Sequence, residues 1–199
     1  MKKKAIFLDK DGIINKLHYD TELGIIHTPL NQAQVEFVFG IFNLLIEAKK
    51  LGYLLIVVSN QPNIGIKKMS MEQFKSLTTY IKKELKKKGV TLDAEYYCFH
   101  HPFADVKKYR KDCFCRKPKT LSYAKAIKRF DIDPKKSWAI GDGLFDIIAG
   151  NAVGLKTILI TNVNETVYLE EFEERLKGSP PKFIVKNLDQ ALEVIKSKK

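Results

Sequence analysis

Ala5-Ile6-Phe7-Leu8-Asp9-Lys10-Asp11-Gly12 is the stretch that decides the fold. Four apolar residues are followed by two carboxylates at positions i and i+2 and then by glycine, which predicts a buried strand ending in a tight turn. Side chains at i and i+2 lie on one side of a strand, so Asp9 and Asp11 can reach one site. Ligands of open parallel α/β sheets bind beyond the carboxyl ends of the strands, so we expect chemistry here, although an ordinary Asp-Gly turn has the same residues.

Length and composition predict one globular domain. The chain has 199 residues, of which 45% are hydrophobic and 29% are charged. No apolar run approaches the roughly 18 residues that span a bilayer, and the run that ends at Asp9 is shorter than the h-region of a signal peptide, about 7–15 residues. We therefore expect a cytoplasmic monomer that does not bind a membrane.

The net charge of +12 raises the question of a nucleic-acid partner. The positive residues are 31 lysines and only 4 arginines. Arginine is the residue favoured for bidentate contacts with phosphates and bases, and most of the lysine pairs fall on the expected helix faces or ends. We interpret the charge as solvated lysine-rich faces and consider a nucleic-acid partner the weaker hypothesis.

A second apolar run, 53–58, predicts a central parallel strand. It ends in Ser59, Asn60 and Gln61. A hydroxyl, two amides and the nearby Gly65 can hold an anion, although the same residues commonly end strands without any ligand. Hydrophobic periodicity predicts further strands near 94–98, 137–140, 156–160 and 183–185, and helices near 38–51, 70–88, 120–130 and 187–197. Two segments are left without regular periodicity: a polar loop over 15–34 that could form a wall of the site, and a charged helix or extended loop over 165–177.

All three cysteines fall in one short span that also holds a histidine. Its pattern is Cys98-x-His100 followed by Cys113-x-Cys115. Three thiols and one imidazole form a common tetrahedral zinc set, and in a reducing compartment such clustering favours metal over a disulfide. Buried free cysteines or one labile disulfide are the alternatives, and the adjacent His101 could be the ligand in place of His100.

Further charged residues follow the cysteines. Lys117 comes directly after the Cys113-x-Cys115 pair, and a cation is needed wherever several carboxylates and a phosphate share a site. Asp142 and Asp146 follow the predicted strand 137–140 at a spacing of four, so both face one side if Asp142 begins a helix. A helix N-cap with an acid in the first turn accounts for the same spacing without any function.

These groups together resemble the four motifs of the haloacid dehalogenase superfamily of phosphohydrolases. The motifs correspond to Asp9-x-Asp11-Gly, Ser59, Lys117 and Gly-Asp142-x-x-x-Asp146. The resemblance covers nearly the whole chain and implies a three-layer α/β/α sandwich around a parallel sheet. It also implies one phosphatase domain over 1–199 without a separate cap domain, because no large insertion separates the motifs.

The cysteine span resembles the zinc loop of a capless subgroup. That subgroup contains D-glycero-D-manno-heptose 1,7-bisphosphate phosphatases and histidinol-phosphate phosphatases. The resemblance implies a zinc-binding loop at about 98–116 in which the metal is structural, with no open catalytic position. The zinc ligands would be Cys98, His100, Cys113 and Cys115.

The resemblance also implies a role for each candidate residue. Asp9 attacks phosphorus to form an aspartyl-phosphate, and Asp11 serves first as acid and then as base. Mg²⁺ is held by Asp9, the backbone carbonyl of Asp11, and Asp142, while Asp146 orients the metal's surroundings. The phosphate or the rest of the substrate contacts Ser59, Asn60, Arg116 and Lys117.

Two departures from the subgroup bear on the substrate. Relatives often carry basic residues at the positions of Ile66 and Gly143. Without these cations, the sequence does not show how a second phosphate would be recognised. We expect a small phosphorylated metabolite as the substrate, with a sugar bisphosphate first, and a histidinol phosphate or a polynucleotide 3′-phosphate as alternatives. A binding module without turnover is disfavoured, since every catalytic group is present.

Overall fold

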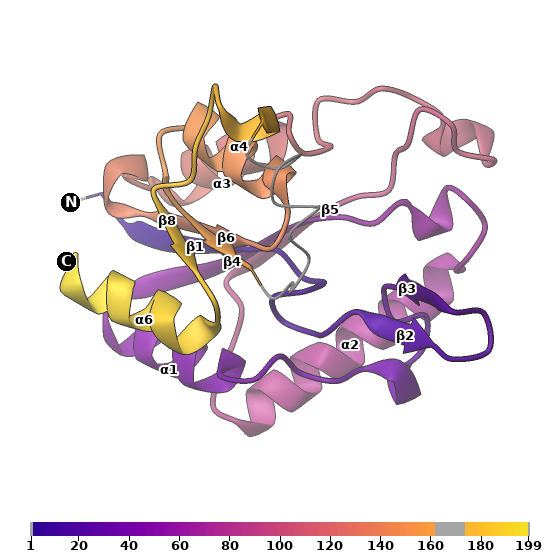
Figure 1. Cartoon of the computed structure of the whole chain (residues 1–199), viewed down its shortest axis with the longest axis horizontal. Coiled ribbons are helices and arrows are strands. Elements are labelled where there is room, and N and C mark those ends of the chain that lie inside the picture. The colour runs from indigo at the N-terminus through magenta and orange to yellow at the C-terminus, as the bar shows by residue number, and fades with distance from the viewer. Residues whose placement is uncertain (1, 162–173, 199) are drawn as a thin grey trace.

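A six-stranded parallel sheet forms the centre of the protein (Figure 1). The structure is a computed structural model and describes residues 2–161 and 174–198. The strand order is β5-β4-β1-β6-β7-β8, and every neighbouring pair is parallel. The strands are β1 (Lys4–Leu8), β4 (Tyr53–Asn60), β5 (Ala94–Cys98), β6 (Trp138–Gly141), β7 (Lys156–Ile160) and β8 (Phe183–Val185).

Helices cover both faces of this sheet (Figure 1). Helices α1, α2 and α6 share one buried cluster with the sheet, and α3 and α4 share the other. The predicted three-layer α/β/α sandwich is therefore confirmed. The α-helices are α1 (Ile41–Lys50), α2 (Met71–Lys87), α3 (Leu121–Phe130), α4 (Leu144–Ala152) and α6 (Leu188–Ser197), and short 3-10 turns are η1 (Gln32–Gln34), η2 (Pro62–Ile64), η3 (Lys107–Tyr109) and η4 (Pro134–Lys136).

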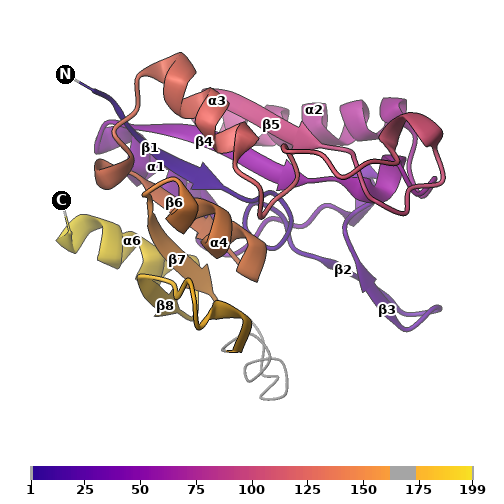
Figure 2. The ribbon, with the colours of Figure 1, turned by 90° about the horizontal axis from the view of Figure 1, so that it is seen from above.

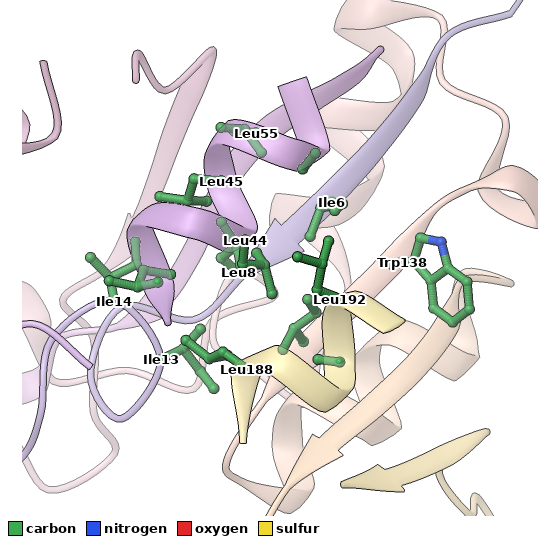
Figure 3. Packing of buried hydrophobic residues seen from close by; sticks show 14 of the residues in the cluster. Ile6, Leu8, Ile13, Ile14, Leu44, Leu45, Leu55, Trp138, Leu188 and Leu192 are labelled. Atoms are coloured by element: carbon green, nitrogen blue, oxygen red, sulfur yellow. The ribbon is translucent and has the colours of Figure 1, made fainter. Parts of the chain in front are cut away.

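Strand β1 is buried on both faces, as its continuous apolar run predicts. Ile6 and Leu8 belong to the cluster that contains Leu44 of α1 and Leu192 of α6 (Figure 3). Phe7 points the other way and packs on α3, since successive side chains alternate across a strand. Burying an Ile, Leu or Phe side chain contributes about 1.5–3 kcal/mol, so the strand that carries Asp9 is firmly held.

Two helix starts differ from the sequence prediction. Helix α1 begins at Ile41 and not near 38, because Gly40 adopts a left-handed conformation with φ +85° directly before it. Asp142 does not begin α4: the N-cap residue is Gly143, in extended conformation, and the helix starts at Leu144. Helix α2 starts as predicted, at a capping box formed by Ser70 and Gln73.

The segment 15–34 contains a β-hairpin, which the sequence did not predict. Strands β2 (His18–Asp20) and β3 (Ile25–His27) pair antiparallel and project away from the central sheet (Figure 2). His18 and His27 lie opposite each other in this ladder, with their ring centroids 5.2 Å apart. The hairpin extends from the same sheet edge at which β1 ends.

Most of the predicted element over 165–177 lies outside the described residues, which resume at 174. Within the described ranges, no helix combines the length and apolarity that crossing a membrane requires.

Candidate active site and metal centre

The predicted site residues come from the carboxyl ends of neighbouring strands. Asp9 follows β1, Ser59 and Asn60 end β4, and Asp142 follows β6. Leu8 is paired with Val57 of β4 and with Ile140 of β6, so these ends lie at one edge of the sheet. The parallel topology thus brings together residues that are up to 133 positions apart in the chain.

Three carboxylates converge at this edge. Asp9, Asp142 and Asp146 each offer an oxygen, and these oxygens lie within 4.8 Å of one another. Burial, together with the charges of Asp9 and Asp146, raises the pKa of Asp142 to about 8. Burial also raises the pKa of Asp146 to about 7, against the opposing effect of Lys117. Such crowding of acids is unfavourable without a cation, and a set of hard oxygen donors fits Mg²⁺.

Lys117 lies within this carboxylate group. Its Nζ is 2.5 Å from Asp146 Oδ1, 3.1 Å from Asp9 Oδ1 and 2.8 Å from the carbonyl oxygen of Val58. Burial disfavours the charged ammonium, but the carboxylates of Asp146 and Asp9 outweigh it and raise the pKa of Lys117. The lysine therefore stays protonated and gives the site a fixed positive charge.

Two residues predicted to contact substrate have other partners for their side chains. The Asn60 amide donates to the Lys117 carbonyl at 3.1 Å and accepts from the Lys117 N–H at 3.0 Å. Arg116 Nη1 donates to the carbonyl of His100 at 3.2 Å. Both side chains therefore hold the segment that carries Lys117 in place.

The side chain of Asp11 points to a different set of partners from that of Asp9. It forms a buried ion pair with Lys10, and it accepts hydrogen bonds from Asn15 Nδ2 at 2.9 Å and Gln61 Nε2 at 2.7 Å. Gln61 also donates to Ser59 Oγ at 3.0 Å. The sequence assigned no role to Lys10 or Asn15, and Gln61 was predicted only as one of two amides that can hold an anion. The one available signal was that Gln61 stands at i+2 from Ser59, which puts both on one side of an extended chain.

Gly12 allows the chain to turn tightly beside the carboxylates. Its φ is +81°, a left-handed conformation that side chains rarely adopt. A Cβ on Gly12 would stand 1.8 Å from Asp142 Oδ2. Any other residue here would displace Asp142, so the glycine of the first motif is required by contact as well as by backbone conformation.

A second group of residues that could hold a metal ion lies at the end of β5 and in the loop that follows it. The sulfur atoms of Cys98, Cys113 and Cys115 are 2.9–3.4 Å apart, and His100 Nδ1 is 3.4 Å from Cys115 and 3.7 Å from Cys98. These distances are far above the S–S bond of about 2.05 Å, so the thiols are free. Three sulfurs and one nitrogen around one point fit tetrahedral zinc.

The structure distinguishes the two adjacent histidines. His100 belongs to the cysteine group, whereas the Nδ1 atom of His101 accepts a hydrogen bond from the Phe103 N–H at 3.2 Å. Cys115 lies two residues before Lys117, and Ser122 Oγ donates to the Cys115 carbonyl at 3.3 Å. The cysteine group therefore sits at the base of the segment that positions Lys117.

Comparison with known proteins gives a consistent picture. A family model described as HAD-hydrolase-like matches residues 114–191. The D-glycero-β-D-manno-heptose-1,7-bisphosphate 7-phosphatase of Pasteurella multocida is 38% identical over 165 residues, which are 83% of this chain and 85% of that protein. The Escherichia coli K12 protein of the same name is 36% identical, over 82% of this chain and 81% of its own length.

The fold is shared with solved structures. The crystal structure of D,D-heptose 1,7-bisphosphate phosphatase from B. bronchiseptica, complexed with magnesium and phosphate, matches with a TM-score of 0.78 and 21% identity. The match covers 98% of this chain and 99% of that chain. The Burkholderia thailandensis enzyme of the same name matches with a TM-score of 0.64 and 21% identity, over 98% of this chain and all of that chain.

Proposed function

Since this chain belongs to the family of haloacid dehalogenase-like hydrolases, as the heptose-bisphosphate phosphatases that it resembles do, we propose that it is a Mg²⁺-dependent phosphatase acting on a sugar bisphosphate. The observation that carries the proposal is that Asp9, Lys117, Asp142 and Asp146 converge at one sheet edge, beside Ser59. The proposed substrate is D-glycero-D-manno-heptose 1,7-bisphosphate, the compound in the names of its relatives.

In this proposal, Asp9 is the nucleophile. Its Oδ1 atom accepts the Lys10 N–H at 2.7 Å and lies 3.1 Å from Lys117 Nζ, which leaves Oδ2 to attack. The Oδ2–phosphorus bond forms as the bond from phosphorus to the sugar oxygen breaks, giving an aspartyl-phosphate. Lys117 and the Ser59 hydroxyl hold the phosphoryl oxygens. Mg²⁺, bound by Asp9, Asp142 and the Asp11 carbonyl, would supply the remaining positive charge.

In this proposal, Asp11 is the general acid and then the general base. It gives one to the departing sugar oxygen and then takes one from the water that attacks the aspartyl-phosphate, which releases phosphate and restores Asp9. The contacts from Lys10, Asn15 and Gln61 fix the orientation of its carboxyl group. A carboxyl group held this firmly is suited to act first as an acid and then as a base at one position.

Zinc, in the proposal, is structural. With three thiolates and His100 as ligands it has no position left for substrate, so it would organise the loop that ends in Lys117. The proposal further treats the enzyme as a single-domain monomer of the cytoplasm, where cysteines that form no disulfide remain reduced. Asp146 is assigned to hold Lys117 and the surroundings of Mg²⁺.

An activity screen tests this function. The purified protein would be incubated with Mg²⁺ and, separately, heptose 1,7-bisphosphate, hexose phosphates, histidinol phosphate and a 3′-phosphorylated oligonucleotide, and the phosphate released would be measured. We expect the highest kcat/KM on the heptose bisphosphate. A higher kcat/KM on histidinol phosphate or the oligonucleotide would overturn the proposed substrate. The absence of phosphate release from every compound would overturn the proposed phosphatase activity.

A further inference from the structure

A pocket of about 360 Å³ opens beside the carboxylate group. Gly12 and Asp142 form one wall, and most of the rest is apolar, including Leu17, Val38 and Phe39. Lys16 also lines the pocket. Small-molecule sites are usually clefts of about 300–1,000 Å³ with apolar walls and a few polar groups, and this pocket fits that description. It therefore lies where the part of a substrate beyond the reacting phosphate could bind.

The backbone of Lys16 is fixed relative to the catalytic groups. Its N–H donates to the carbonyl of Glu36 at 2.7 Å, within a short antiparallel contact between 14–16 and 36–38. Asn15 Nδ2 bridges the Lys16 carbonyl at 3.0 Å and the Asp11 carboxylate at 2.9 Å. Because one side chain joins the two, the backbone of Lys16 keeps a constant spacing from the Asp11 carboxylate.

The charge of Lys16 is available to a ligand. Its Nζ is 3.0 Å from a Glu36 carboxylate oxygen, and the side chains of Lys16 and Glu36 are 54% and 69% exposed. An exposed pair of this kind contributes only about 0–1 kcal/mol, so an anion can replace Glu36 at little cost. Lys10 and Lys117, by contrast, are buried and held by Asp11 and by Asp9 with Asp146.

We propose that Lys16 binds the phosphate of the substrate that is not hydrolysed. This inference rests on the proposed function, because it concerns the second anionic group of the same bisphosphate. Leu17 and Phe39 line the same pocket and offer apolar surface to the carbon chain of the substrate beside this ion pair.

A matched pair of substrates tests the assignment. The name of the relatives places the reaction at the C7 phosphate, and we propose the same for this chain. Heptose 1,7-bisphosphate and heptose 7-phosphate both carry that phosphate and differ only in the phosphate at C1. For Lys16→Met we expect kcat/KM on the bisphosphate to fall about 10- to 100-fold, mostly through a higher KM, since a lost charged hydrogen bond has this effect. On the 7-phosphate we expect a change of less than twofold. Lys16→Arg keeps the positive charge, so it should keep most of the preference for the bisphosphate over the 7-phosphate.

Two controls separate this effect from general ones. Lys50→Met removes another exposed lysine that pairs with a glutamate, Glu47, at 2.8 Å on α1, and should leave both substrates unaffected. Glu36→Gln frees Lys16 without removing it, so KM for the bisphosphate should stay equal or fall. Equal losses on both substrates for Lys16→Met, or no loss on either, would overturn the assignment while leaving the phosphatase intact. If the unaltered protein hydrolyses neither substrate, the proposed function is what fails, and the assignment fails with it.

Discussion

The side-chain amide of Asn60 and the backbone of Lys117 form two hydrogen bonds, of 3.0 and 3.1 Å. This relationship ties the end of β4 to the loop that follows the cysteine group. It explains how a lysine 57 residues further along the chain is delivered between Asp9 and Asp146. Asn60 acts through Lys117, so a substitution of Asn60 should displace the positive charge of Lys117.

Asn60→Ala should lower kcat about 10- to 100-fold and the free energy of unfolding by about 1–3 kcal/mol, because it leaves a part-buried N–H and carbonyl unpaired. Steady-state kinetics and urea unfolding would measure the two effects. Asn63→Ala is the matched control, since its amide donates to Thr28 Oγ1 at 2.7 Å and does not touch Lys117. If Asn60→Ala kept the kcat of the unaltered protein, the positioning role would be wrong.

The part-buried carboxyl of Asp142 predicts a pH dependence of stability. Its pKa is about 8 in the folded protein, against an ordinary value of 3.8. Between these values the folded protein keeps a proton that the unfolded chain releases, so stability should fall as pH rises, by about 1 kcal/mol per pH unit for such a group. Urea unfolding of Mg²⁺-free protein from pH 5 to 8 would show this, with a shallower slope for Asp142→Asn.

Magnesium should reverse that trend. A cation binds the ionised carboxylates and competes with their protons, so added Mg²⁺ should raise the Tm more at pH 8 than at pH 6. Asp142→Asn should lose most of this stabilisation. An equal rise in Tm for the variant and the unaltered protein would place the cation elsewhere.

The cysteine group should hold one zinc ion per chain. Cys113→Ser should reduce both the zinc content and the Tm, because structural zinc contributes to folding, and activity should fall as Lys117 loses its position. The adjacent histidines supply a matched pair: His100→Ala should lose zinc, and His101→Ala should keep it. Elemental analysis of protein purified without chelator measures this, and a stoichiometry near zero would contradict it.

Short DNA should not bind at physiological ionic strength despite the charge of +12. Binding driven by phosphate contacts falls steeply with salt, through counterion release. Gel-shift measurements at low and at physiological salt would distinguish weak, nonspecific contacts between lysines and DNA from a specific DNA-binding site. Retention of a clear shift at the higher salt would favour a polynucleotide substrate.

The sequence predicted the central elements well and the contacts between distant residues poorly. Strands β5 and β7 were predicted with the bounds that the structure shows, because their apolar or aromatic runs are short and sharply limited. The β2–β3 hairpin was missed, since strands of three residues are too short for alternation to be visible.

The candidate site also has a part that the sequence predicts and a part that it does not. The convergence of Asp9, Ser59 and Asp142 follows from parallel topology once the strand ends are known. Lys117 lies on a loop instead, and Asn60 holds its backbone in place. The contact of Gln61 with Asp11 joins residues 50 positions apart, and that of Lys10 depends on how the chain folds back after β1. No periodicity records such contacts, so only the tertiary structure reveals them.

The central claim is that Asp9 attacks phosphorus. The most direct measurement is the rate of phosphate release from heptose 1,7-bisphosphate, with saturating Mg²⁺, by the unaltered protein and by Asp9→Asn. The substitution removes the attacking charge with almost no change in volume, so the fold should remain. We expect the rate to fall to an undetectable level while the Tm changes little. A variant that keeps more than about one-hundredth of the rate, a barrier change of only about 2.7 kcal/mol, would contradict the covalent mechanism.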